Sequence, residues 1–332
     1  VGSFPQHRSD KGGDWWCPNQ WRQEAGQRAF FLRSSGEERR PTHIGPSAKE
    51  QSDKLCVQIE MSDDLFTSGA ITVAADCANL LGESPVWIAG ERALYWVDIL
   101  APAIWRLRLD DHHIDHWTPP FALSSLVPRA AGGLAGAGER GIITFDPNAN
   151  DYAVIAHPEQ GETGNRYNDG AVDPAGGYWV GSMDASEARP TGKVYRISGD
   201  HVPHLLDRDF LIPNGPAFSP DGHIAYLADS ARRVVYRYVL APDGNIIRRE
   251  KFLKFKRVEG RPDGMATDAN GCLWIAFWDG GCVRCFNPDG SKLRKIDLPV
   301  SRPTSCAFGG DALDQLFITS ARTGLSDAQL GR

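Results

Sequence analysis

Four polar side chains stand at similar points of four similar sequence segments: Glu83, Asn168, Asn214 and Asp263. An aromatic-centred apolar run, such as Leu94-Tyr95-Trp96-Val97, follows each of them. Carboxylate and amide oxygens, with no Cys or His among them, are the ligands that Ca²⁺, Mg²⁺ or Mn²⁺ prefers. If the segments are units around one axis, the four side chains converge and form a hard-metal site. Three of them, Glu83, Asn214 and Asp263, offer two carboxylates and one amide oxygen, and as ligands they would leave coordination positions for water and substrate, as a catalytic centre requires. Asn168 could contact the metal, a bound water or the substrate.

The spacing of these residues indicates a repeat. With Ser125 and Ser305 added, the residue numbers 83, 125, 168, 214, 263 and 305 differ by 42 to 49. A period of 40 to 50 residues with several strands per unit is typical of a β-propeller. Six units predict six blades, and each polar position is expected to open the innermost strand of its blade. A solenoid is the alternative, although its period is normally shorter or helical.

The segments between these positions read as strands joined by tight turns. Apolar runs at 93–99 and 104–109 lie close together, and Pro-Asp-Gly turns follow Ser219, Ala241 and Asn287. Proline fixes φ and glycine accepts positive φ in such turns. No sustained helical period is present. The predicted fold class is therefore all-β, a six-bladed β-propeller over residues 71–332.

Residues 1–70 differ from the rest of the chain. They are rich in Gly, Ser, Arg, Gln and Glu and show no sustained period, so we expect a poorly structured or non-native N-terminal extension. The first methionine is Met61, close to the predicted start of the propeller. The expected division is thus an extension over 1–70 and one propeller domain.

Composition limits the classes of partner. A formal net charge of -6 disfavours nucleic acid as a partner. No window of 18 apolar residues is present, which predicts no membrane interaction, and the N-terminus does not resemble a signal peptide. The seven cysteines follow no framework pattern, and Cys282 and Cys285 of the single C-x-x-C are expected to face opposite sides of a strand. We expect a cytoplasmic protein that is a monomer or a weak homo-oligomer.

Several motifs carry a family resemblance over residues 76–325. They are Leu81-Gly82-Glu83-Ser84-Pro85, Arg166-Tyr167-Asn168-Asp169-Gly170, Gly181-Ser182-Met183, Pro213-Asn214-Gly215, Arg261-Pro262-Asp263-Gly264-Met265 and Pro303-Thr304-Ser305-Cys306. In order and spacing the chain resembles the SMP-30/gluconolactonase/LRE-like family, which includes regucalcin and bacterial sugar lactonases. The resemblance implies a six-bladed propeller with one divalent metal cation, drawn from Ca, Mg, Mn, Zn and Fe(II). It also implies a small-molecule sugar lactone as substrate.

The resemblance assigns roles to particular residues. It implies metal ligation by Glu83, Asn214 and Asp263 and sugar-hydroxyl contacts by Arg166 and Asn168. An acidic substrate contact often follows the Gly-Ser-Met strand in the family, and Glu187 is the candidate here, with a solvated loop carboxylate as the alternative. The expected reaction is the opening of an aldonolactone, with Asp263 also accepting a proton from the attacking water.

Other interpretations of the sequence stay open. The same scaffold could serve an arylesterase or phosphotriesterase, or a calcium-binding regulatory protein without turnover. The cluster of His112, His113 and His116 could look like a second metal site, but a solvated turn is the interpretation we favour. Relatives usually continue beyond the last strand seen here, so we expect either a truncated C-terminus or a different closure of the ring.

Overall fold

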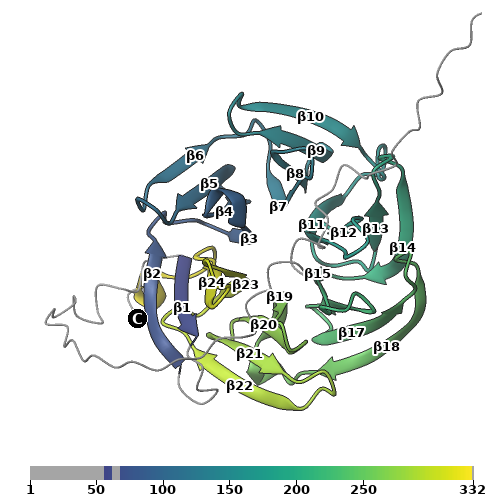
Figure 1. Cartoon of the computed structure of the whole chain (residues 1–332). Coiled ribbons are helices and arrows are strands. Elements are labelled where there is room, and N and C mark those ends of the chain that lie inside the picture. The colour runs from purple at the N-terminus through teal and green to yellow at the C-terminus, as the bar shows by residue number, and fades with distance from the viewer. Residues whose placement is uncertain (1–55, 62–67, 331–332) are drawn as a thin grey trace, which may run out of the picture.

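The computed structural model describes residues 56–61 and 68–330. Its strands form six four-stranded sheets. The sheets are arranged around one axis, each with its innermost strand toward the centre (Figure 1). The predicted all-β, six-bladed propeller is confirmed.

Five blades are built from consecutive strands. Blades one and two contain β3 (Gly82–Ile88), β4 (Ala93–Asp98), β5 (Ala103–Arg108), β6 (Ile114–Trp117), β7 (Leu123–Pro128), β8 (Leu134–Gly138), β9 (Gly141–Asp146) and β10 (Asp151–Ala156). Blade three contains β11 (Asn165–Val172), β12 (Tyr178–Asp184), β13 (Gly192–Ile197) and β14 (Pro203–Phe210). Blades four and five contain β15 (Pro213–Phe218), β16 (Ile224–Asp229), β17 (Val234–Leu240), β18 (Ile246–Lys254), β19 (Arg261–Thr267), β20 (Leu273–Trp278), β21 (Cys282–Phe286) and β22 (Lys292–Asp297).

Blade six joins the two ends of the described chain. Its inner strands are β23 (Pro303–Gly309) and β24 (Gln315–Ser320), and its outer strands are β1 (Cys56–Met61) and β2 (Ser68–Ala75). β1 pairs antiparallel with β24, so that Cys56 lies opposite Thr319. The ring is therefore closed by strands from the N-terminal side. Of the two alternatives expected for the C-terminus, this is the different closure of the ring.

This closure corrects the predicted domain boundary. The expected extension reached residue 70, but β1 and the start of β2 lie before that limit and belong to the propeller. No clear period marks this segment because β1 has only six residues and takes its strand conformation from pairing with β24. The remainder of the expected extension, residues 1–55, lies outside the described residues.

The core lies between successive blades. The second strand of each blade is almost fully buried, and in every blade except blade two it carries large aromatic side chains, including Tyr95, Trp96, Tyr178 and Trp179, all without exposed surface. These residues bury large apolar areas against the neighbouring sheets. The aromatic-centred runs thus hold the blades together and fix the innermost strands that precede them.

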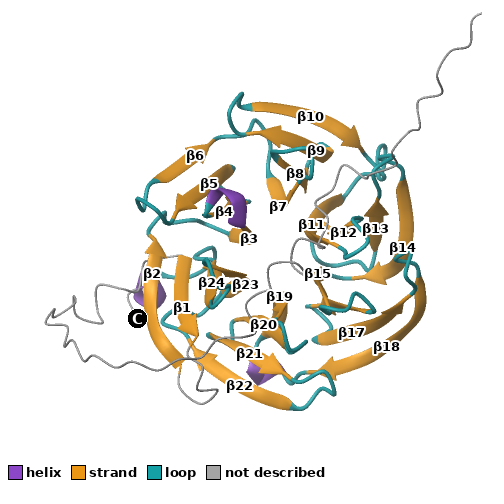
Figure 2. Cartoon of the chain, viewed as in Figure 1, coloured by secondary structure: helices purple, strands orange, loops and turns teal. Residues whose placement is uncertain are grey.

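Helical structure is minor, as Figure 2 shows. It consists of the short elements η1 (Ala89–Glu91), η2 (Arg257–Glu259) and α2 (Asp327–Leu330) in the described chain. None of these is long or apolar enough to cross a membrane. Cys282 and Cys285 are free thiols that contribute to two different core clusters, which confirms that they face opposite sides of β21.

Candidate functional site

The six predicted polar positions all lie on the innermost strands. In every one of these strands the pairing register shifts at that point, between 83 and 86, 123 and 125, 167 and 170, 214 and 217, 262 and 265, and 303 and 305. Such a bulge leaves residues out of the ladder and re-aims their side chains. We call these six bulged segments the strand heads.

The strand heads also bond neighbouring blades to one another. The Ser84 hydroxyl accepts from the backbone N–H of Leu126 at 2.8 Å, and the Ser124 hydroxyl donates to the Asn168 carbonyl at 2.7 Å. Between blades five and six the contact is steric: a Cβ at Gly264 would lie 2.1 Å from the Ser305 hydroxyl. Glycine after Asp263 therefore allows the two blades to approach, and Ser305 is a packing partner.

Two of the predicted ligands are buried carboxylates that influence each other. Glu83 and Asp263 are 8% and 6% exposed. Burial and repulsion from Asp263 and then Asp169 hold the pKa of Glu83 well above its usual range. Burial and repulsion from Asp169 likewise raise the pKa of Asp263. The structure thus brings these acidic groups into one site, where a cation would relieve their repulsion.

Asp169 is a third buried carboxylate in this site, and the sequence analysis did not select it. It accepts hydrogen bonds from the backbone N–H of Gly170 at 2.8 Å and of Gly215, in the next blade, at 3.0 Å. Burial raises its pKa to about 7, although these two N–H groups oppose the shift. Asp169 holds the strand head of blade four in place directly after Asn214.

The predicted amides form one chain of hydrogen bonds. The Nδ2 of Asn168 donates to the Oδ1 of Asn214 at 2.7 Å, and the Nδ2 of Asn214 donates to the Ser230 hydroxyl at 2.8 Å. Ser230 in turn donates to the Pro262 carbonyl at 2.6 Å, one residue before Asp263. These bonds fix the Asn214 amide so that its oxygen is the group on the Asn168 side.

Arg166 extends this chain. Its Nη1 donates to the Oδ1 of Asn168 at 2.7 Å. Burial lowers the pKa of the guanidinium, and the charges of Glu187, Glu83 and Asp263 act in the opposite direction. The nearness of Glu187 to Arg166 and Asp263 is consistent with its predicted place beside the site. Glu187 itself is exposed, on the loop after β12.

Ser125 borders the acidic cluster through Tyr178, which Asp169 influences, whereas the three histidines lie on an outer hairpin. The Ser125 hydroxyl bonds to the Tyr178 hydroxyl at 2.5 Å, between blades two and three. His112, His113 and His116 are exposed around the outer hairpin of blade one, where His113 pairs with Asp115 and His116 stacks on Trp105. His112 and His113 lie in the exposed turn that was favoured, whereas His116 lies in β6 (Ile114–Trp117) with its side chain exposed.

A second residue beside the site was also missed. Glu159 is 5% exposed and accepts hydrogen bonds from Ser182 at 2.6 Å, Tyr195 at 3.1 Å and Asn165 at 3.0 Å. Asn165 directly precedes Arg166, so Glu159 anchors the backbone that presents this arginine. A single glutamate in a polar loop gives no sequence signal for such a role, and Asp169, within the Asn-Asp-Gly motif, reads as a turn residue.

The comparison with known families agrees with this geometry. Residues 81–322 match the SMP-30/Gluconolactonase/LRE-like region. The chain belongs to this family. The match extends from the strand head of blade one to the end of β24 and includes all six strand heads of this SMP-30/gluconolactonase/LRE-like protein.

Individual relatives cover most of the same region. A 6-deoxy-6-sulfogluconolactonase of Pseudomonas putida is 39% identical over 76% of this chain and 87% of its own length. A pentonolactonase of Haloferax volcanii is 33% identical over 76% of this chain and 85% of its own. Among solved structures, a calcium-binding regucalcin of Agrobacterium tumefaciens is 29% identical, with a TM-score of 0.73 over 75% of this chain and 85% of that one.

Proposed function

We propose that this protein hydrolyses aldonolactones to aldonic acids at the strand heads. The observation that carries the proposal is the cluster of buried carboxylates, Glu83, Asp169 and Asp263, next to the Arg166–Asn168–Asn214 hydrogen-bond chain. The two curated relatives described above are named as lactonases, which supports the same reaction class.

The donor set fits a divalent cation. Two carboxylates and an amide oxygen are hard ligands, and the raised pKa of both carboxyl groups reflects burial without sufficient compensating charge. Glu83, Asn214 and Asp263 would hold the ion. When bound, the cation would supply Lewis-acid polarisation of the lactone carbonyl. Its positive charge would also lower the pKa of Asp263 and keep that carboxylate ionised.

The side chains of this protein then perform the remaining steps. The Asp263 carboxylate accepts a proton from the water that attacks the ring carbonyl. Arg166 and Asn168 orient the sugar through its hydroxyl groups, with Glu187 as a further contact from the loop. Because Asn168 is already bonded to Arg166 and Asn214, it couples the position of the substrate to that of the metal ligand.

A panel of substrates and metal ions tests this proposal. The purified full chain, treated with a chelator, is assayed for acid release from hexono- and pentonolactones after addition of Ca²⁺, Mg²⁺, Mn²⁺, Zn²⁺ or Fe²⁺. The proposal expects metal-dependent opening of sugar lactones and little turnover of aryl esters or phosphotriesters. Faster turnover of aryl esters or phosphotriesters, which need no hydroxyl-binding groups, would replace it with the arylesterase or phosphotriesterase alternative.

A calcium-binding protein without turnover is the second candidate. The calcium-binding regucalcin structure among the relatives favours it. It predicts that Glu83→Gln lowers calcium affinity while no lactone in the panel is opened by the unmodified chain. Calorimetric calcium titration of both proteins, run beside the lactone assay, separates the two candidates.

A further inference from the structure

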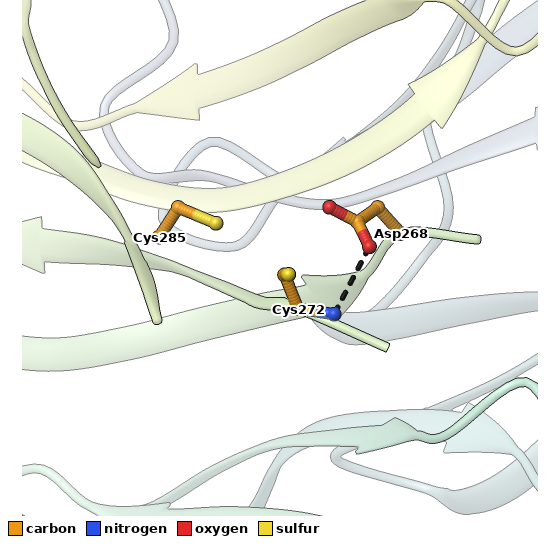
Figure 3. Close-up of side chains that lie close together, drawn as sticks. All are labelled: Asp268, Cys272 and Cys285. Carbon is orange, nitrogen blue, oxygen red and sulfur yellow. Dashed lines mark hydrogen bonds between the residues drawn. The ribbon is translucent and has the colours of Figure 1, made fainter. Parts of the chain in front are cut away.

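A second group of metal-ligand side chains lies at the other end of blade five. Asp268 follows β19, Cys272 precedes β20 and Cys285 lies in β21. One ligand atom from each of the three lies within 4.8 Å of the others. Both sulfur atoms and one carboxylate oxygen point toward one another (Figure 3). Asp268 is five residues beyond Asp263 along an extended chain, roughly 17 Å away, so this group is separate from the strand heads.

Blade three has a similar turn, around Asp173, at the position that Asp268 occupies in blade five. Asp173 accepts the backbone N–H groups of Ala175 and Gly177 and the indole N–H of Trp179. Asp268 makes the same three bonds at the same spacing, from Asn270, Cys272 and Trp274. The two turns are therefore structural equivalents, and each carboxylate is oriented in the same way.

The two turns differ in the residue that lies opposite the tryptophan on the neighbouring strand. Arg196 lies opposite Trp179 on the neighbouring strand, and its guanidinium bonds to both Asp173 oxygens, at 2.5 and 3.2 Å. The residue opposite Trp274 is Cys285. Within the described ranges, Asp268 has no ion pair with a lysine, arginine or histidine. Blade five thus keeps the carboxylate but replaces its cation with a thiol.

A fourth donor completes the group. The Oδ1 of Asn287 lies 3.8 Å from the Sγ of Cys272, and the Nδ2 of Asn287 donates to the Ser291 hydroxyl at 2.9 Å, which fixes the direction of the amide. Cysteine thiolates and an aspartate are ligand types that Zn²⁺ takes in a four-coordinate tetrahedral site, and the Asn287 amide oxygen supplies a fourth donor beside Cys272. Sulfur atoms around zinc stand about 3.8 Å apart, given Zn–S bonds of about 2.3 Å, so only a small contraction is needed.

We propose that Asp268, Cys272, Cys285 and Asn287 bind a thiophilic divalent cation such as Zn²⁺, which occupies the place that Arg196 fills in blade three. The indole N–H of Trp274 and the N–H groups of the turn orient the ligating carboxylate, as supporting hydrogen bonds do in known zinc sites. The ion is structural, because no coordination position is left for substrate.

Binding is an exchange of protons for the metal. Each thiol loses its proton to solvent, and the two thiolates and the carboxylate share the charge of the ion. Zinc affinity is therefore expected to rise with pH.

The test uses Co²⁺ as a spectroscopic substitute for zinc, with the full chain under reducing conditions. A Glu83→Gln background removes the proposed ion at the strand heads, so that failure of the catalytic proposal leaves this measurement unaffected. The proposal expects one equivalent of Co²⁺ with a thiolate charge-transfer band, displaced by one equivalent of Zn²⁺. Absence of the band in correctly folded protein would overturn it.

Matched variants assign the ligands. Cys272→Ser and Cys285→Ser are expected to abolish the band, and Asp268→Asn to lower zinc affinity while the turn is kept. Trp274→Phe should weaken binding about 10- to 100-fold through the lost supporting bond. Cys282→Ser is the control, because this thiol is equally buried in the same strand but faces the other side. Equal loss of the band in Cys282→Ser, or an unchanged band in Cys285→Ser, contradicts the proposal.

Discussion

Buried carboxylates occur at both ends of the innermost strands, but the hydrogen-bond donors and charges around them differ between the two ends. Asp173, in the turn that follows β11, receives three N–H donors and a guanidinium. Among the described residues, Glu83 at a strand head receives one hydrogen bond, from the backbone N–H of Ser84 at 3.2 Å, and is repelled by two other carboxylates. Both side chains are buried, with Asp173 1% and Glu83 8% exposed. The supply of donors, rather than burial, therefore distinguishes a structural carboxylate from a candidate functional one.

The strongest test of this contrast removes one carboxylate from each end of the same strand. Asp263→Ala should reduce kcat/KM for lactone opening by about 10³-fold or more, because both a proposed metal ligand and the proposed proton acceptor are lost. Asp268→Asn should leave kcat/KM within about twofold per folded molecule. Steady-state assays with added divalent cation measure both values. Comparable losses in the two variants would remove the functional distinction between the ends.

For the free energy of unfolding, in contrast to activity, the carboxylate in the turn is expected to matter most. Asp173→Ala leaves the largely buried Arg196 guanidinium and the Trp179 indole without their partner, and should lower the free energy of unfolding by about 3–5 kcal/mol. Urea denaturation measures the change. Replacing Arg196 with Met in the same variant should recover part of the loss, because the uncompensated charge is then removed. A change below about 1 kcal/mol in Asp173→Ala would contradict the structural role.

The pH dependence of stability sharpens the contrast further. Asp169 has a folded-state pKa of about 7, above its unfolded value, so the folded state binds the proton more tightly. Without divalent cations, its contribution to stability is full at about pH 4 and is lost as the pH rises to about 7, at up to about 1.4 kcal/mol per pH unit. Urea titrations in the presence of a chelator should show a shallower slope for Asp169→Asn. The same slope in the unmodified chain and in this variant would show that Asp169 does not titrate in this window.

The smallest expected effect concerns the support of one ligand. Ser230→Ala removes the bond that holds the Asn214 amide and should weaken divalent-cation binding about tenfold. Ser219→Ala is a suitable control, since this serine belongs to a turn at the other end of blade four. Calorimetric titration with Ca²⁺ compares the two. Equal affinities in both variants would show that the bond to Ser230 does not position the ligand.

The sequence predicted the parts of the molecule that recur. Glu83, Asn214 and Asp263 were found because the 42- to 49-residue spacing places them at one point of each blade. Features that depend on contacts between distant segments were not found. Asp169 reads as part of an Asn-Asp-Gly turn until the N–H of Gly215 in the next blade is seen to bind it.

The cysteines illustrate the same limit. Spacing in the sequence groups Cys282 with Cys285, but their side chains separate into different clusters. The pairing of β20 with β21 instead brings Cys285 beside Cys272 and Asp268. Strand register, which the sequence did not specify in this detail, decides which thiols are neighbours.

The pairing of β1 with β24 has a consequence for the order of events during synthesis. Of the described strands, β1 emerges first from the ribosome and can pair with β2, but its second partner, β24, is available only when residues 315–320 have been made. Blades one to five contain strands that follow one another and can assemble as they emerge. Ring closure is therefore the step with the longest sequence separation, which is also the slowest kind of contact to form. Until then the edge of β1 that pairs with β24 is open, and β24 in turn is covered by a segment made before the rest of the propeller.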